Sequence, residues 1–162
     1  MQAYTVINGK DIASLALVTR EPQALGPHDV RVRINAVSLN FRDLMVARGD
    51  YLQGASSPVI PASDAAGEVI EVGKAVTRFA PGDRVMGSFF PDWIDGDATP
   101  ATTRVAPGAA TDGVLSTERV FAETALAATP PSLSDEQAST LPCAAVTACL
   151  LYTSDAADEE DS

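Results

Sequence analysis

A strict alternation of apolar and polar side chains between residues 30 and 35 most constrains the fold of this chain. The segment VRVRIN places valine or isoleucine at every even position and arginine or asparagine at every odd one. A period of two is that of a β-strand with one buried and one solvated face. We therefore expect a strand within VRVRINAVSLN, and with it a sheet that has a wet side.

Further strand-like segments surround this one, and turn-forming residues divide them. AYTVIN and LALVTR flank the turn-like NGKD, GEVIEVG has glycine at each end, and APGD leads into RVMG. LSTERVFAETALAATP returns to strand after SFFPDWIDGDATPATTRVAPGAATDGV, a stretch rich in Pro, Gly, Thr and Asp that we interpret as a long loop. The pattern predicts a mainly β domain built from short strands.

Two short helices are expected between the strands. Asn40 is a suitable N-cap for FRDLMVAR, in which Phe41, Leu44 and Met45 follow helical spacing, and Gly49 is a suitable C-terminal stop. In SLSDEQAS, a serine followed three residues later by glutamine forms a capping box and starts a second helix.

Length and composition exclude several classes of protein. The 162 residues are 46% hydrophobic and 20% charged, which suits one globular domain with its own core. The net charge is −11, or −6 without the five acidic residues beyond Cys149, so no nucleic-acid-binding surface is expected. No segment resembles a signal peptide or spans a bilayer, and the two cysteines form no disulfide framework, so we expect a reducing cytoplasm and no membrane partner.

Seven segments in order carry a resemblance to a known family: SLNFRD, RGDY, PASDAAGEVIEVG, FAPGDRV, FFPDWIDG, DGVLSTERVF and TLPCAAVTA. Over residues 1–148 the chain resembles the N-terminal half of the medium-chain dehydrogenase/reductase superfamily. It is most similar to the zinc-free, quinone-oxidoreductase-like branch of the alcohol dehydrogenases. No G-x-G-x-x-G fingerprint of a dinucleotide-binding Rossmann domain occurs in the chain.

The resemblance implies a division of the chain into three parts. Residues 1–125 would form a GroES-like β-barrel with short helices that holds substrate, and residues 126–148 would begin the connection to a cofactor domain missing from this chain. The parent protein would transfer hydride between NADP or NAD and a small carbonyl, alcohol, enone or quinone. It would act on a small molecule and could be a homodimer, and the truncated chain alone would be inactive.

The same resemblance indicates that no catalytic zinc is bound. The zinc ligands of metal-dependent relatives would fall on Asn40, Ser63 and Cys143, so only one of three keeps a thiolate. Catalytic zinc requires three protein ligands and an open position. Asp64, next to Ser63, is the one further donor at this place.

Four residues are candidates for contact with the cofactor or for catalysis. By resemblance Asn40 lies near the nicotinamide, where its amide could donate to a developing oxyanion; it could equally only cap the helix. Tyr51 is a candidate proton donor, or else a packing residue. Phe41 and Arg42 would contact the cofactor, although Arg42 could simply face solvent.

Other residues admit a functional and a structural interpretation. By resemblance Thr147 lies beside the nicotinamide ring, and Cys143 is a packing residue. Trp93 and Phe90 could line an apolar substrate pocket, or pack their loop against the barrel. Asp43 is expected to stabilise the helix N-terminus. His28, the only histidine, is expected to be exposed in a loop.

The last segment, residues 149–162, departs from the pattern before it. One back-translation of CLLYTSDAADE resembles the mosaic end and adapter of transposase-based sequencing libraries, so we interpret this tail as a non-native artefact. The alternative is an acidic interaction tail, in which case the chain is a stand-alone GroES-like binding or assembly module.

Overall fold

The computed structural model describes residues 1–51 and 58–150. Within these ranges the elements are β1 (Gln2–Thr5), η1 (Ile12–Ser14), β2 (Ala16–Thr19), β3 (Asp29–Ser38), α1 (Phe41–Arg48), β4 (Asp64–Val72), β5 (Arg84–Gly87), β6 (Glu118–Ala122), η2 (Glu123–Ala125), β7 (Leu126–Ala128), α2 (Asp135–Ala138) and η3 (Leu141–Ala145). The mainly β prediction is confirmed. The predicted tail, residues 149–162, lies outside the described residues except for Cys149 and Leu150.

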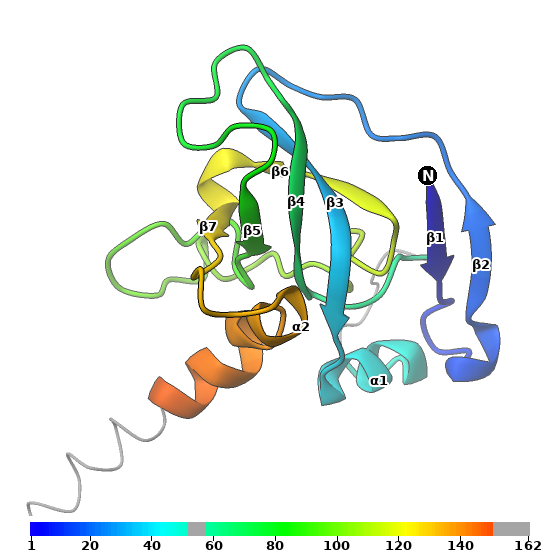
Figure 1. Cartoon of the computed structure of the whole chain (residues 1–162). Coiled ribbons are helices and arrows are strands. Elements are labelled where there is room, and N and C mark those ends of the chain that lie inside the picture. Colours follow the sequence, from blue (N-terminus) through cyan, green and yellow to red (C-terminus); the bar gives the residue numbers. More distant parts are fainter. Residues whose placement is uncertain (52–57, 151–162) are drawn as a thin grey trace, which may run out of the picture.

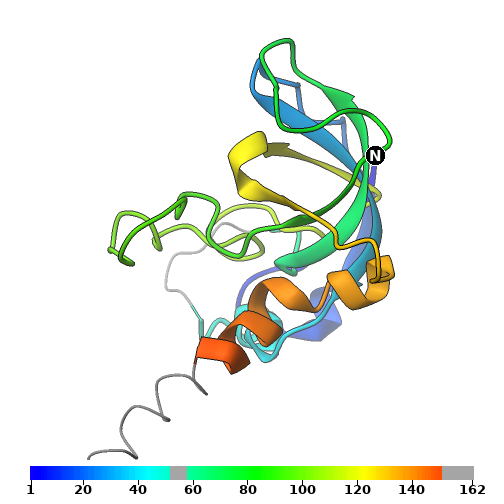
Figure 2. The ribbon, with the colours of Figure 1, turned by 60° about the vertical axis from the view of Figure 1, so that its left-hand side comes forward.

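One antiparallel sheet forms the centre of the molecule. Its strand order is β6-β3-β4-β5-β7, and β1 and β2 form a separate hairpin beside it (Figure 1). The sheet curls into a half-barrel, and the segment between β5 and β6 projects away from the strands (Figure 2). β7 pairs with β5, so the sheet continues through Leu126–Ala128.

The alternation in β3 produces the expected two faces. Val30 and Val32 are buried, whereas Arg31 pairs with Glu71 and Glu118 on the other face. Along β4, Gly67 permits close strand approach, because a Cβ there would lie 2.0 Å from the carbonyl oxygen of Arg33. Burial of one face of β3 and β4 fixes the register of the sheet.

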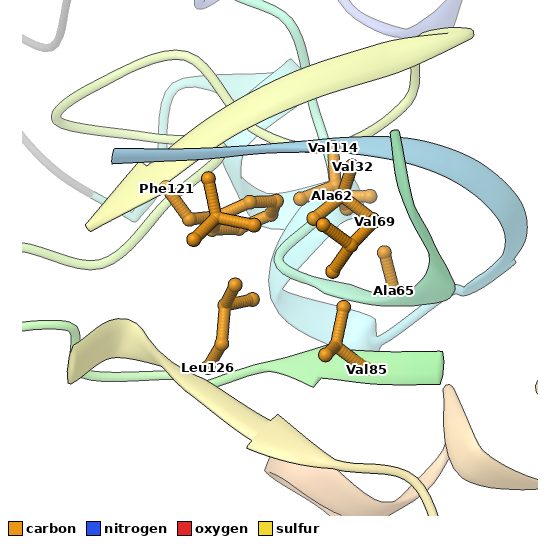
Figure 3. Packing of buried hydrophobic residues seen from close by; sticks show 9 residues of the cluster. Val32, Ala62, Ala65, Val69, Val85, Val114, Phe121 and Leu126 are labelled. Carbon is orange, nitrogen blue, oxygen red and sulfur yellow. The ribbon is translucent and has the colours of Figure 1, made fainter. Parts of the chain in front are cut away.

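Two hydrophobic clusters form the core. The larger lies inside the curled sheet (Figure 3) and consists of Val30, Val32, Ala62, Ala65, Val69, Val85, Val114, Phe121 and Leu126. The smaller lies under α1 and consists of Val6, Val46, Ala47, Val59 and Ala109, with Tyr51 packed against it. The second cluster anchors α1 next to the strand ends.

Both predicted helices are present. α1 ends at Gly49, which adopts the left-handed conformation with φ 86°. In α2 the backbone N–H of Gln137 donates to Ser134 Oγ, and that of Ser134 donates to Gln137 Oε1. Both helices and η3 lie at the same end of the sheet (Figures 1 and 2). In the described ranges no helix is long and apolar enough to cross a membrane.

Candidate functional site

The N-terminus of α1 presents the amide of Asn40. The backbone N–H of Asn40 donates to Asp43 Oδ2 at 2.8 Å, and the backbone N–H of Asp43 donates to the carbonyl oxygen of Asn40 at 3.0 Å. These bonds cap the helix without the side-chain NH₂ of Asn40. That Nδ2 atom is buried and has no hydrogen-bond partner among the described residues. Buried donors normally have an acceptor, so this unpaired amide is an exception that requires an explanation.

A strained turn positions the next two polar residues. Ala62 has φ 65°, which is rare for a residue with a side chain. Gly113 packs so closely against this turn that a Cβ would lie 2.0 Å from the carbonyl oxygen of Ala62. The turn directs Ser63 and Asp64 into the protein, where both are almost completely buried.

Asp64 joins this turn to η3. Ser63 Oγ donates to Asp64 Oδ1 at 2.5 Å, and the backbone N–H of Cys143 donates to Asp64 Oδ2 at 2.9 Å. Each carboxylate oxygen of Asp64 thus accepts a hydrogen bond, and these bonds offset part of the free-energy cost of burying the charge. We call Asn40, Asp43, Ser63, Asp64 and Cys143 the polar cluster.

Burial raises the pKa of two side chains in the polar cluster. It raises the pKa of Asp43, with a contribution from the charge of Asp64, while the Asn40 N–H and Arg42 act in the opposite direction. Burial and Asp64 raise the pKa of the Cys143 thiol, opposed by Arg42 and by a hydrogen bond with Thr147. Both shifts favour the neutral form of the side chain.

The donor types at this place do not match a catalytic metal site. Asn40, Ser63 and Cys143 provide an amide, a hydroxyl and a single thiol, and Asp64 already accepts two hydrogen bonds. Among residues 1–51 and 58–150 no group of three His, Cys, Asp or Glu side chains is arranged to hold a metal ion.

An apolar pocket of about 250 Å³ has in its wall Pro142, the residue before Cys143, although no residue of the polar cluster lines it. Its wall includes an aromatic series in which Phe89 and Phe90 make an edge-to-face contact at 4.7 Å, and the rings of Phe90 and Trp93 are 6.4 Å apart. Trp93 Nε1 donates to the carbonyl oxygen of Gly96, so the indole is held at the pocket edge. The pocket is lined by Met86, Gly87, Ser88, Phe89, Phe90, Trp93, Ala127, Leu141, Pro142 and Val146.

The structure brings some of the predicted site residues together and separates others. Phe90 and Trp93 share the pocket, and Thr147 contacts Cys143. Arg42 is buried against the ring of Tyr51, so the side chain does not face solvent. Phe41, the other candidate for cofactor contact, is 74% exposed and lies outside the second core cluster.

Sequence reasoning did not identify the contribution of residues 141–146 to the pocket or the anchoring role of Asp64. No local pattern signals the first, because Leu141 and Val146 meet Met86 only through the fold. A signal for the second exists: a Ser-Asp pair opens the buried strand DAAGEVIEV, where a charge needs a specific partner.

A curled antiparallel sheet with a capped helix at its end, a buried polar cluster and an adjoining apolar pocket defines a GroES-like domain of the alcohol dehydrogenase type. A family model, the alcohol dehydrogenase GroES-like domain, matches residues 26–131. The chain belongs to this family, within the medium-chain dehydrogenase/reductase superfamily, and the predicted GroES-like fold is confirmed.

Individual relatives agree with this assignment. The chain is 43% identical over 127 residues to a zinc-type alcohol dehydrogenase-like protein of Schizosaccharomyces pombe, covering 78% of this chain and 37% of the relative. It is 33% identical over 117 residues to a quinone oxidoreductase-like protein 2 homolog of Nematostella vectensis, covering 72% and 27%. A solved structure from Sinorhizobium meliloti 1021, assigned to the alcohol dehydrogenases, has a TM-score of 0.76 and 42% identity, covering 91% and 45%. The chain thus spans less than half the length of these relatives.

Proposed function

We propose that this chain is the substrate-holding part of an NAD(P)H-dependent oxidoreductase that transfers hydride between the nicotinamide and a small carbonyl, alcohol, enone or quinone without catalytic zinc. The observation that carries the proposal is the buried, unpartnered Nδ2 of Asn40 at the head of α1. Family membership supports the reaction class, and the presence of an amide and a hydroxyl beside a single thiol supports a metal-free site.

The residues present fit a nicotinamide cofactor at this end of the sheet. Asn40 offers a buried donor, Phe41 offers an exposed ring, and Thr147 lies next to Cys143. The cofactor, when bound, supplies or accepts the hydride. Asn40 would donate to the substrate oxygen as negative charge develops on it, and the apolar pocket would hold the substrate and exclude water. Tyr51 is the proposed source of the proton.

The proposal also requires a cofactor-binding part outside these 162 residues. The test begins by re-sequencing the gene of origin beyond the codon for Ala148, with a library method that does not use transposase. A frame that continues into a G-x-G-x-x-G segment would then be expressed in full and assayed by loss of NADPH or NADH absorbance with a quinone and an enone. A frame that ends with residues 149–162 would argue for the stand-alone module instead.

The complete protein allows a sharper test of Asn40. We expect Asn40→Ala to lower kcat/KM by about 100-fold, the usual loss for one oxyanion donor. Asn40→Asp is the matched variant, since it keeps the size and removes the donor. A chelator should leave the activity unchanged. Retention of activity in both variants, or loss on chelation, would contradict the proposal.

A further inference from the structure

Arg42 is a buried cation whose charge is not balanced in the usual way, by an ion pair. Its residue surface is 8% exposed, and in the described part of the chain no carboxylate forms an ion pair with its guanidinium. Burial of an unpaired charge is costly unless other groups replace the lost hydration. The charge of Arg42 acts on the Asp43 carboxyl group without an ion pair, so the direct contacts of its guanidinium are with other groups.

Two rings and one carbonyl make these direct contacts, whereas Nε and Nη2 of Arg42 are buried and have no hydrogen-bond partner among the described residues. The guanidinium carbon lies 4.8 Å from the ring centroid of Tyr51 and 5.0 Å from that of Phe89. Nη1 donates to the carbonyl oxygen of Pro107 at 2.8 Å. A planar guanidinium can stack on aromatic faces and donate in its own plane at once, whereas an ammonium cannot.

These contacts join segments that are distant in the sequence. Arg42 belongs to α1, Tyr51 follows that helix, and Phe89 and Pro107 lie toward the two ends of the long loop between β5 and β6. Phe89 lines the apolar pocket and contacts Phe90, whereas Arg42 itself does not line it. The guanidinium is thus coupled to the pocket through one ring.

We propose that Arg42 is a positioning residue that sets the shape of the apolar pocket and the place of the Tyr51 ring, and that it does so through Phe89 and Pro107 without touching the bound molecule. The inference rests on the proposed function only in taking this pocket as the substrate site. It predicts that a ligand meets the ring of Phe89 and not a positive charge, so the pocket favours neutral apolar ligands.

The test uses the 162-residue chain and cinnamaldehyde as a neutral aromatic probe. Trp93 is the only tryptophan and stands at the pocket, so its emission, corrected for probe absorbance, reports binding. We expect Arg42→Met to weaken binding by about 10-fold, since it removes two cation–π contacts and keeps the side-chain length. Arg42→Lys should recover part of the affinity, because it retains the charge. Arg48→Met, an exposed position on the same helix, is the control and should bind like the native chain.

A double-mutant comparison separates positioning from other roles. If Arg42 acts through Phe89, Phe89→Leu alone weakens binding, and adding Arg42→Met to it causes little further loss. Fully additive losses, unchanged binding in Arg42→Met, or unchanged binding in Phe89→Leu would overturn the inference. Phe89→Leu and Arg42→Lys keep the test decisive if Arg42→Met does not fold.

The binding assay contains no dinucleotide, so its outcome does not depend on the proposed hydride transfer. Absence of cinnamaldehyde binding to the native chain would overturn this inference and leave the hydride-transfer test untouched. A complete protein without NADPH-dependent turnover, together with the expected binding losses here, would overturn the proposed function and leave the role of Arg42 in place.

Discussion

Asp64 is the residue on which the arrangement of the polar cluster most depends. It is completely buried and accepts hydrogen bonds from Ser63 and from the backbone of Cys143, 79 residues away. Each acceptor atom serves a different part of the chain. The side chain therefore links the strained turn before β4 to the helical segment that lines the apolar pocket.

Asp64→Asn should destabilise the chain by about 1–3 kcal/mol, because the amide keeps one acceptor and leaves the other buried donor unpaired. Urea unfolding followed by Trp93 emission measures the change. Asp97→Asn, at an exposed position, is the matched control and should leave the midpoint unchanged. Equal midpoints for the two variants would show that the buried hydrogen bonds of Asp64 contribute little.

The same substitution should change the titration of Cys143. The pKa of this thiol is raised by burial and next by the charge of Asp64, so removing that charge should lower it. The rate of alkylation by iodoacetamide against pH reports the thiolate, and a Cys149→Ser background leaves Cys143 as the only thiol. A pH profile that does not move would assign the whole shift to burial.

At the scale of elements, local patterns predicted most of the fold. The alternation in β3, the cap of α1 and the capping box of α2 each have a cause within a few residues, and each is found in the structure. The buried face of α1 was not predictable in this way. Arg42 could contact the cofactor or face solvent by its sequence, but it is buried, since Tyr51 and Phe89 supply the rings that receive its guanidinium.

The candidate site shows the same limit. Phe90 and Trp93 lie together because they are three residues apart in one loop, which a sequence reveals. Leu141, Pro142 and Val146 line the same pocket through the fold, in which β7 pairs with β5 and the backbone of Cys143 in η3 donates to Asp64. Contacts set by sheet topology leave no periodic signal in either segment.

Glu123, in η2, connects this element to the loop before β3 and to the loop between β4 and β5. Its Oε2 accepts from the backbone N–H groups of Thr77 and Arg78, and its Oε1 contacts His28 Nδ1 at 3.3 Å. The side chain of His28 is largely exposed, as predicted. These bonds, led by the one from Thr77, lower the pKa of Glu123 below its ordinary value of 4.5.

A carboxyl group whose pKa is lowered on folding stabilises the native state above its unfolded pKa. That stability is lost as the pH falls through the lower, folded pKa. We therefore expect the native chain to lose stability below about pH 5, and Glu123→Gln to be less stable at pH 7 with a flatter acid dependence. Thermal unfolding between pH 3 and 7 measures both, with Glu21→Gln, at an exposed position, as control. Parallel curves for native chain and Glu123→Gln would contradict this account.

At the scale of the whole molecule, the candidate functional residues lie at one end of the sheet, where much apolar surface is exposed. A second cavity of about 380 Å³ adjoins Asn40 and is lined by Val6, Ile12, Leu15, Leu39, Asn40, Phe41, Asp43, Leu44, Ala47, Pro61 and Leu115. Leu39 and Phe41 are each more than 70% exposed. Exposed apolar surface of this kind marks an interaction site, or a tendency to associate.

The 162-residue chain should bind a ligand in its apolar pocket without catalysing hydride transfer. We expect no measurable oxidation of NADPH with a quinone or an enone, because the sequence contains no glycine-rich turn at a helix N-terminus to hold a pyrophosphate. Absorbance at 340 nm measures this, with the complete protein of the proposed function as the positive control. Enzyme-like turnover by the chain alone would show that dinucleotide binding does not need a Rossmann fingerprint here. Binding of cinnamaldehyde at Trp93 without turnover would show that the pocket is formed by this fold alone, while the reactive geometry requires a cofactor held from elsewhere.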